Sequence, residues 1–260
     1  MTGAVDALTF VFGLLVGSFL NVVIYRVPRG ESIVKPRSRC PHCGTEIRAF
    51  DNIPVLSWLI LRGRCRDCHG PISIRYPAVE LATGTIFLVM ALRFGATWEL
   101  PAYLYLAAIG VALSMIDFDV KRLPDVIVLP SYVVVGVLLL LPAVADSAWS
   151  NYLRAWLGAL VLFAFYFLLM FIYPAGMGFG DVKLSGVLGM YLGWVSWGLV
   201  ILGTFVGFLL GALVGVAVML VRKGGRKTKV PFGPFMVIGT FLALFFGQPV
   251  IDWYTAGIGL

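Results

Sequence analysis

The chain has 260 residues, of which 60% are apolar and only 13% are charged, with 20 Lys and Arg against 13 Asp and Glu. This charged share is about half that of an ordinary soluble domain, which argues against a water-soluble globular protein. The high apolar content, the aperiodic glycines and the four cysteines also exclude disordered, collagen and disulfide-scaffold classes.

Apolar runs near the length of a membrane span recur along the whole chain and predict an all-α polytopic membrane protein with about eight transmembrane helices. The expected spans are 8–25, 77–94, 102–116, 126–144, 155–173, 182–194, 197–221 and 232–251. The sixth is short for a bilayer, so we expect it to be buried among its neighbours, tilted or lengthened. Glycines 203, 207, 211 and 215 in the seventh form a stripe typical of helix packing.

The basic residues are concentrated in alternate connections. The odd-numbered connections hold 18 of the 20 Lys and Arg, and ten of these lie in 26–76. The positive-inside rule places these connections in the cytoplasm and both termini outside. The basic excess therefore indicates topology, and we expect the lipid bilayer and no nucleic acid as partner, since base-stacking aromatics are absent from these loops.

The first connection contains all four cysteines, as two CxxC pairs: Cys40, Cys43, Cys65 and Cys68. Two such pairs about twenty residues apart suit a tetrahedral four-thiolate zinc site. A loop with few aliphatic residues cannot bury much core, so a structural metal would stabilise its fold.

Three other interpretations of the cysteines remain open. Cys65 to His69 matches a CxxCH haem-attachment motif, but Cys43 is followed by Gly44. Disulfides are disfavoured in a reducing cytoplasm, and no βαβ pattern accompanies the pairs as in redox proteins. His42 and His69 are interpreted as bystanders, because four thiols already fill a closed site.

Two aspartates are expected at one depth and on one side of the membrane. Asp117 follows the third span, and Asp181 opens the sixth within the string GMGFGDVKL. Span alternation puts both at the cytoplasmic face, where a pair of carboxylates can share a proton, one acting as acid while the other activates water. Gly178 and Gly180 leave room for a substrate backbone.

Other acidic residues have structural interpretations. Asp125 is expected to N-cap the fourth span, and Asp119 to lie on a solvated surface. Asp181 itself could equally cap the sixth helix. Glu80, inside the second span, is expected to pair with Arg75 or a neighbouring helix, although a functional role is also open.

The motifs together resemble a known family. GFGD resembles the GxGD motif of intramembrane aspartyl peptidases, and the whole chain is similar to type IV prepilin peptidases. The similarity runs through GSFLNVVIYRVP, both CxxC pairs, NIPVLSWLILRGRC, RYPAVE, IDFDVKRLPD, GMGFGDVKL and VPFGPF, with no departure at positions expected to carry chemistry.

The resemblance implies a bacterial inner-membrane endopeptidase that removes the basic leader of type IV prepilins or pseudopilins after a glycine, on the cytoplasmic side. It also implies N-methylation of the new terminus with S-adenosylmethionine, for which no site can be located here. Asp117 and Asp181 would be catalytic, and the four cysteines would bind structural zinc. The domains would be a first transmembrane helix (1–25), a cytoplasmic zinc-binding loop domain (26–76) and a multi-helix membrane peptidase domain (77–260).

Two other functional classes stay open from the residues alone. A transporter or channel could use Asp117, Asp181 and Glu80 to relay protons or bind cations, but no inverted repeat is visible. A membrane scaffold could use the zinc loop to bind a partner. Neither explains two aspartates at one depth beside a GxGD string.

Overall fold

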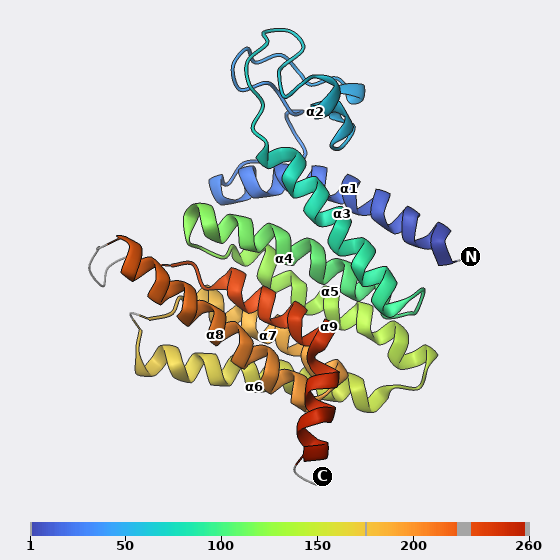
Figure 1. The fold of residues 1–260 in the computed structure, drawn as a ribbon, viewed down its shortest axis with the longest axis vertical. Coiled ribbons are helices and arrows are strands. Elements are labelled where there is room, and N and C mark those ends of the chain that lie inside the picture. Colours follow the sequence, from blue (N-terminus) through green and yellow to red (C-terminus); the bar gives the residue numbers. More distant parts are fainter. Residues whose placement is uncertain (1, 175, 223–229, 258–260) are drawn as a thin grey trace. The chain divides into compact units, whose positions relative to one another are not determined.

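The structure, a computed structural model, describes residues 2–174, 176–222 and 230–257 (Figure 1). Within these ranges every regular element is a helix, and the extended pairings are two isolated bridges, Arg39 with Glu46 and Arg64 with Pro71. This confirms the all-α class.

The helices follow one another with short connections, apart from the loop after the first. In chain order they are α1 (Thr2–Arg26), η1 (Val27–Arg29), η2 (Ala49–Asn52), α2 (Leu56–Ile60), α3 (Arg75–Phe94), α4 (Leu100–Val120), α5 (Asp125–Ala145), α6 (Trp149–Ile172), α7 (Phe179–Val195), α8 (Trp197–Arg222) and α9 (Gly233–Gly257).

Among the described residues, seven helices are long and apolar enough to cross a membrane: α1, α3, α4, α5, α6, α8 and α9. The chain is therefore a multi-pass membrane protein. The eight predicted spans correspond to α1 and to α3 through α9. The sixth, α7, has 17 residues and is buried almost continuously from Val182 to Trp194, which confirms that the short span is enclosed by its neighbours.

The chain divides into two compact units, Met1–Ala112 and Leu113–Leu260. In the first unit, α1 packs against α3 through glycines. A Cβ at Gly13 would lie 2.8 Å from the Cα of Gly84, and one at Gly17 would lie 2.7 Å from the Cα of Glu80. The two helices therefore approach at backbone distance, as small residues allow inside membranes.

In the second unit, glycines likewise allow close packing of α6 against α7 and of α8 against α9. A Cβ at Gly158 would lie 2.5 Å from the Gly189 carbonyl oxygen, and one at Gly239 would lie 2.7 Å from that of Gly203. The glycine stripe of α8 is thus used for packing at Gly203 and Gly207. Gly215, at its far end, faces open space.

The buried helix α7 ends against one arginine. Arg154 of α6 donates from Nε to the Gly193 carbonyl (2.6 Å), and from its NH2 group to the carbonyls of Trp194 (2.6 Å) and Val195 (2.8 Å). The last carbonyls of a helix have no partner within the helix, and a cation there also complements the helix dipole. Arg154 therefore satisfies the C-terminus of α7 without water.

Candidate functional site

Asp117 lies inside the last turn of α4 and not beyond it. The helix continues to Val120 because Asp117 and Asp119 do not stop a helix, and the first proline comes at Pro124. The Asp117 side chain is only 5% exposed, and its Oδ2 accepts a hydrogen bond from the backbone N–H of Gly233 at 3.0 Å. One carboxylate oxygen is thus fixed by a backbone donor.

Gly233, the first residue of α9, is present because a larger residue would not fit. A Cβ there would lie 2.9 Å from Asp117 Oδ2 and 3.4 Å from the Leu123 side chain. Only glycine brings its N–H this close to the carboxylate without pushing it away.

Asp181 is the third residue of α7. Its Oδ2 accepts a hydrogen bond from the N–H of Gly178, the N-cap residue, at 3.1 Å. This is the carboxylate half of a capping box, so the predicted capping role of Asp181 is confirmed. Asp181 also lies close enough to Asp117 for the two carboxylates to interact electrostatically. The structure therefore brings the two predicted site residues together within one unit.

Leu123, in the connection after α4, packs between the start of α7 and the start of α9. A Cβ at Gly180 would lie 3.0 Å from the Leu123 Cβ, and one at Gly233 would lie 3.4 Å from the Leu123 Cδ2. Glycines on both sides of Leu123 therefore set the spacing between the start of α7 and the start of α9.

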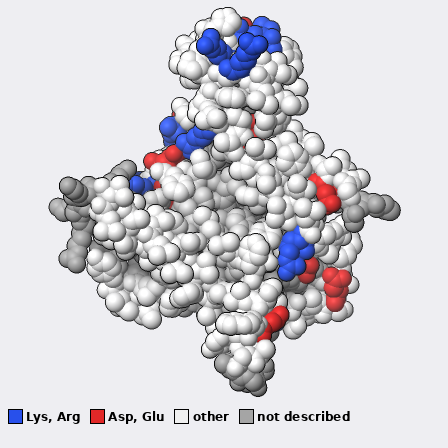
Figure 2. All heavy atoms as spheres, in the orientation of Figure 1, with Lys and Arg blue, Asp and Glu red and all other residues white. Residues whose placement is uncertain are grey.

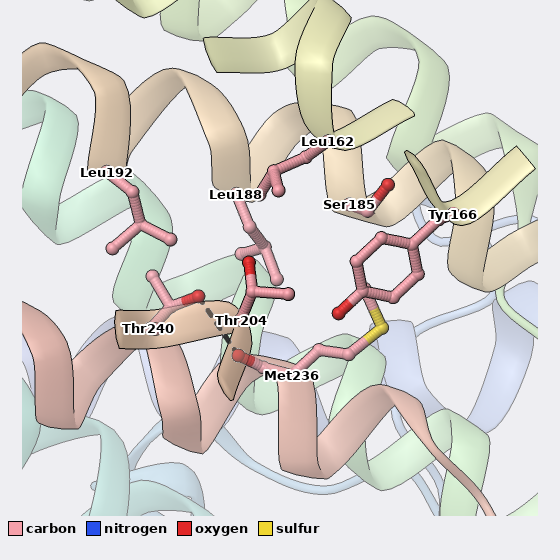
Figure 3. Close-up of a pocket in the computed structure, with 9 residues that line it drawn as sticks. Leu162, Tyr166, Ser185, Leu188, Leu192, Thr204, Met236 and Thr240 are labelled. Carbon is pink, nitrogen blue, oxygen red and sulfur yellow. Dashed lines mark hydrogen bonds between the residues drawn. The ribbon is translucent and has the colours of Figure 1, made fainter. Parts of the chain in front are cut away.

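An aromatic cluster flanks the aspartates. Tyr166 of α6, Phe208 of α8 and Phe232 have ring centroids 5.1–6.4 Å apart, and the buried Tyr166 lies near Asp181. Beside Tyr166 lies a cavity of about 10 Å³, which Thr204 and Thr240 line from α8 and α9 (Figure 3). This volume suffices for about one water.

Asp125 does not have the expected role. Pro124 is the N-cap of α5, and the Asp125 carboxylate makes an ion pair with Lys183, with both oxygens 2.8 Å from Nζ. The N-cap prediction was wrong because Pro124, one residue earlier, already has the extended backbone that an N-cap needs. The pair ties the start of α5 to the start of α7. Asp119 is exposed, as predicted.

Glu80 belongs to the first unit, whereas both aspartates belong to the second. Its carboxylate accepts a hydrogen bond from the N–H of Val55 at 2.7 Å and lies beside Ser18 of α1. A partner on the neighbouring helix was expected and is present in Ser18. The contact with Val55, in the loop, was not foreseen.

The four cysteine sulfurs form one cluster, with all Sγ atoms within 4.8 Å of one another. A tetrahedral site with metal–sulfur bonds of about 2.3 Å has sulfur–sulfur edges of about 3.8 Å. The distance between Cys40 Sγ and Cys68 Sγ is 3.8 Å. The residues therefore fit a tetrahedrally bound metal ion, as the spacing predicted.

The two CxxC turns share one pattern of backbone hydrogen bonds and one position with positive φ. The Cys40 N–H donates to the Thr45 carbonyl and the Cys65 N–H to the Gly70 carbonyl, both at 2.9 Å. The residue after the second cysteine has positive φ in each turn: Gly44 at 73° and His69 at 57°. His69 thus occupies a turn position and is outside the ligand cluster, which explains the haem-like CxxCH string without haem.

A bidentate ion pair supports the second turn. Arg66 donates to both carboxylate oxygens of Asp51, at 2.6 Å from its NH2 group and 2.9 Å from Nε. The Arg66 guanidinium lowers the pKa of the Asp51 carboxyl. This contact joins η2 to the cysteine cluster.

Two protein-family models match this chain, one over the segment with the cysteines and one over the segment with the aspartates. The model of the bacterial peptidase A24 N-terminal domain matches residues 11–94, and that of the type IV leader peptidase family matches residues 104–218. A prepilin leader peptidase/N-methyltransferase of Aeromonas hydrophila is 38% identical, with 95% of this chain and 93% of the relative covered. This chain belongs to the prepilin leader peptidase/N-methyltransferase family.

Two other members of the family have similar sequence identity to this chain. The Stutzerimonas stutzeri relative is 38% identical over 94% of this chain and 91% of its own. The Pseudomonas aeruginosa relative is 37% identical over 95% and 92%. No solved structure matches this chain. The four cysteines fall within the N-terminal model and both aspartates within the leader peptidase model, which confirms the resemblance inferred from the motifs.

Several residues around the family's motifs were not foreseen as site residues: Gly233, Leu123, Tyr166 and Lys183. Gly233 carried one usable signal, a glycine directly before a proline at the start of an apolar run, which is typical of a helix N-terminus. The others lie in apolar or basic surroundings that give no local sign of proximity to a carboxylate.

Proposed function

We propose that this protein is a membrane aspartyl endopeptidase that removes the basic leader of type IV prepilins or pseudopilins after a glycine, with Asp117 and Asp181 as its catalytic pair. The observation that carries the assignment is the placement of these two carboxylates. They come from two helices, interact electrostatically, and each accept a backbone N–H that fixes one oxygen. Family membership supplies the substrate class.

In the proposed reaction, one aspartate is ionised and the other protonated. The ionised carboxylate takes a proton from water as the water oxygen bonds to the glycine carbonyl carbon, and the protonated one donates to the carbonyl oxygen. Collapse of the tetrahedral intermediate breaks the C–N bond. The leaving amine takes a proton from the aspartate that gained one, and the other aspartate takes back a hydroxyl proton as the C=O re-forms, which restores the starting pair. No covalent enzyme intermediate forms.

The N–H groups of Gly233 and Gly178 give this pair its orientation. Each occupies the Oδ2 atom of one aspartate, which leaves the two Oδ1 atoms for water and substrate. Pre-oriented groups lower the cost of reaching the transition state.

The four thiolates would hold a structural zinc ion. Four protein ligands close a tetrahedral site and leave no position for a hydrolytic water, so zinc would fold the loop and take no part in the cleavage. N-methylation of the new terminus with S-adenosylmethionine follows from the family, and no residues are assigned to it.

We further propose an inner-membrane orientation in which the zinc loop and the aspartates face the cytoplasm and both termini face outward, on the charge distribution of the connections. The basic positions 223, 226, 227 and 229 of the seventh connection lie outside the described residues. The transporter alternative is not favoured by the family.

Cleavage of a purified prepilin tests the catalytic pair. Asp117→Asn and Asp181→Asn should each abolish cleavage while membrane insertion and zinc content stay unchanged, because each removes half of a shared acid and base. Asp119→Asn and Asp125→Asn are the matched controls and should retain most activity. Substantial cleavage by either of the first two variants would remove the assignment, and ion flux without cleavage by the wild type would favour transport.

A further inference from the structure

The zinc loop presents apolar side chains outward. In α2, Leu56, Leu59 and Ile60 are 57%, 58% and 74% exposed. Three large aliphatic side chains that are each more than half exposed on one short helix form an apolar patch, which is typical of a site of protein or membrane contact.

A basic pocket adjoins this surface. It is open, has a volume of about 600 Å³, and is lined by Ile60 together with Arg62, Arg64, Arg66 and His69. Arg66 forms an ion pair with Asp51, whereas Arg62 and Arg64 form no ion pair with any described residue. Lys and Arg are gathered on the lobe that carries α2 (Figure 2).

The position of α2 is fixed relative to a membrane-spanning helix of the same unit. The N–H of Val55, directly before α2, is bonded to Glu80, the sixth residue of α3. Five residues correspond to about 7.5 Å along a helix axis. The start of α2 therefore lies beside the second turn, at the loop end, of a helix long and apolar enough to cross a membrane.

We propose that α2 lies in the bilayer surface, with Leu56, Leu59 and Ile60 among the lipid chains and Arg62 and Arg64 binding the phosphate of an anionic phospholipid. Apolar side chains beside unpaired arginines match the two layers of a lipid interface. A prepilin leader is basic, so this pocket repels it, which favours lipid over substrate. The proposal goes beyond the proposed function and does not depend on cleavage.

Lipid binding by the full chain with its metal tests this assignment. Titration with phosphatidylglycerol, followed by native mass spectrometry, should show bound lipid that Arg62→Gln with Arg64→Gln weakens roughly 30-fold, at about fivefold per arginine. Lys35→Gln with Arg37→Gln removes the same charge from exposed sites of the same loop and should leave affinity unchanged. An equal loss of lipid affinity in both double variants would show that Arg62 and Arg64 do not form a specific lipid site.

Hydrogen exchange in nanodiscs tests the insertion. The amides of α2 should exchange more slowly when phosphatidylcholine discs contain phosphatidylglycerol, and Leu59→Ser with Ile60→Ser should remove this protection. Ile33→Ser with Val34→Ser, at exposed aliphatic sites of the same loop, is the control and should keep it. Unchanged zinc content verifies folding of each variant.

Three results would contradict the proposal. Equal amide exchange of α2 in discs with and without phosphatidylglycerol would show that α2 does not bind anionic lipid. Equal protection by inorganic phosphate in detergent would make the pocket a site for soluble anions. Protection that appears only when a prepilin is added would make α2 a substrate surface.

Discussion

Asp117 is oriented by a single backbone donor, the N–H of Gly233, and this contact is the most sensitive part of the aspartate pair. The donor comes from 116 residues further along the chain and reaches the carboxylate only because no Cβ stands between them. In the proposed reaction a carboxylate held this way tolerates little displacement, since a shift near 1 Å costs about 100-fold in rate.

Gly233→Ala should therefore lower cleavage on the order of 100-fold with little change in thermal stability. Its Cβ would press on Asp117 Oδ2 at 2.9 Å and turn the carboxylate. The measurement is the prepilin cleavage rate alongside the melting temperature. Gly215→Ala, where nothing lies within 4 Å of the new Cβ, is the control and should cleave normally. Equal rates in the two variants would show that Gly233 does not position Asp117.

At the scale of elements, α7 depends on Arg154. Arg154→Met keeps the length and apolar stem of the side chain but leaves the last carbonyls of a buried helix without donors. We expect the free energy of unfolding to fall by about 3 kcal/mol, with zinc content unchanged. Denaturation in detergent measures it. Arg93→Met, at the end of α3, is the control. An equally large loss of unfolding free energy in that variant would mean that the effect comes from the lost charge alone.

The cysteine turns form a second element whose loss should be separable from cleavage. We expect about one zinc per chain and no Soret band, because four thiolates complete a tetrahedral site. Cys65→Ser with Cys68→Ser should release the metal, expose the loop to protease and impair substrate handling or methylation.

Separate assays of prepilin shortening and of label transfer from S-adenosylmethionine distinguish these effects. The cysteine variant should keep more cleavage than Asp181→Asn, because the four ligands lie far in sequence from both aspartates. If a folded cysteine variant loses cleavage as completely as Asp181→Asn, the zinc loop belongs to the proteolytic site.

For the whole molecule, the alternating charge of the connections predicts orientation. A reporter in the first or seventh connection should be cytoplasmic, and one at the C-terminus should be outside, since 18 of 20 basic residues lie in alternate connections. Reporter fusions and cysteine-independent tag accessibility measure this. A first loop found in the periplasm would reverse the orientation and reopen the haem and disulfide interpretations.

The sequence predicted features that are written locally along the chain. Apolar runs located the spans, CxxC spacing located the ligand cluster, and span alternation placed Asp117 and Asp181 on one side and at similar depth. It missed contacts that depend on how distant segments meet, such as Gly233 with Asp117, Val55 with Glu80 and Lys183 with Asp125. The N-cap error at Asp125 is local instead, because Pro124, one residue earlier, has the extended backbone of the N-cap.

Glu80 lies where three segments of the first unit meet. Its carboxylate accepts the N–H of Val55 in the loop and lies beside Ser18 of α1, while its Cα lies against Gly17. The side chain that holds the start of α2 therefore also lies at the contact between α1 and α3. A change that separates these two helices should also loosen the attachment of the loop, because both contacts share this buried residue.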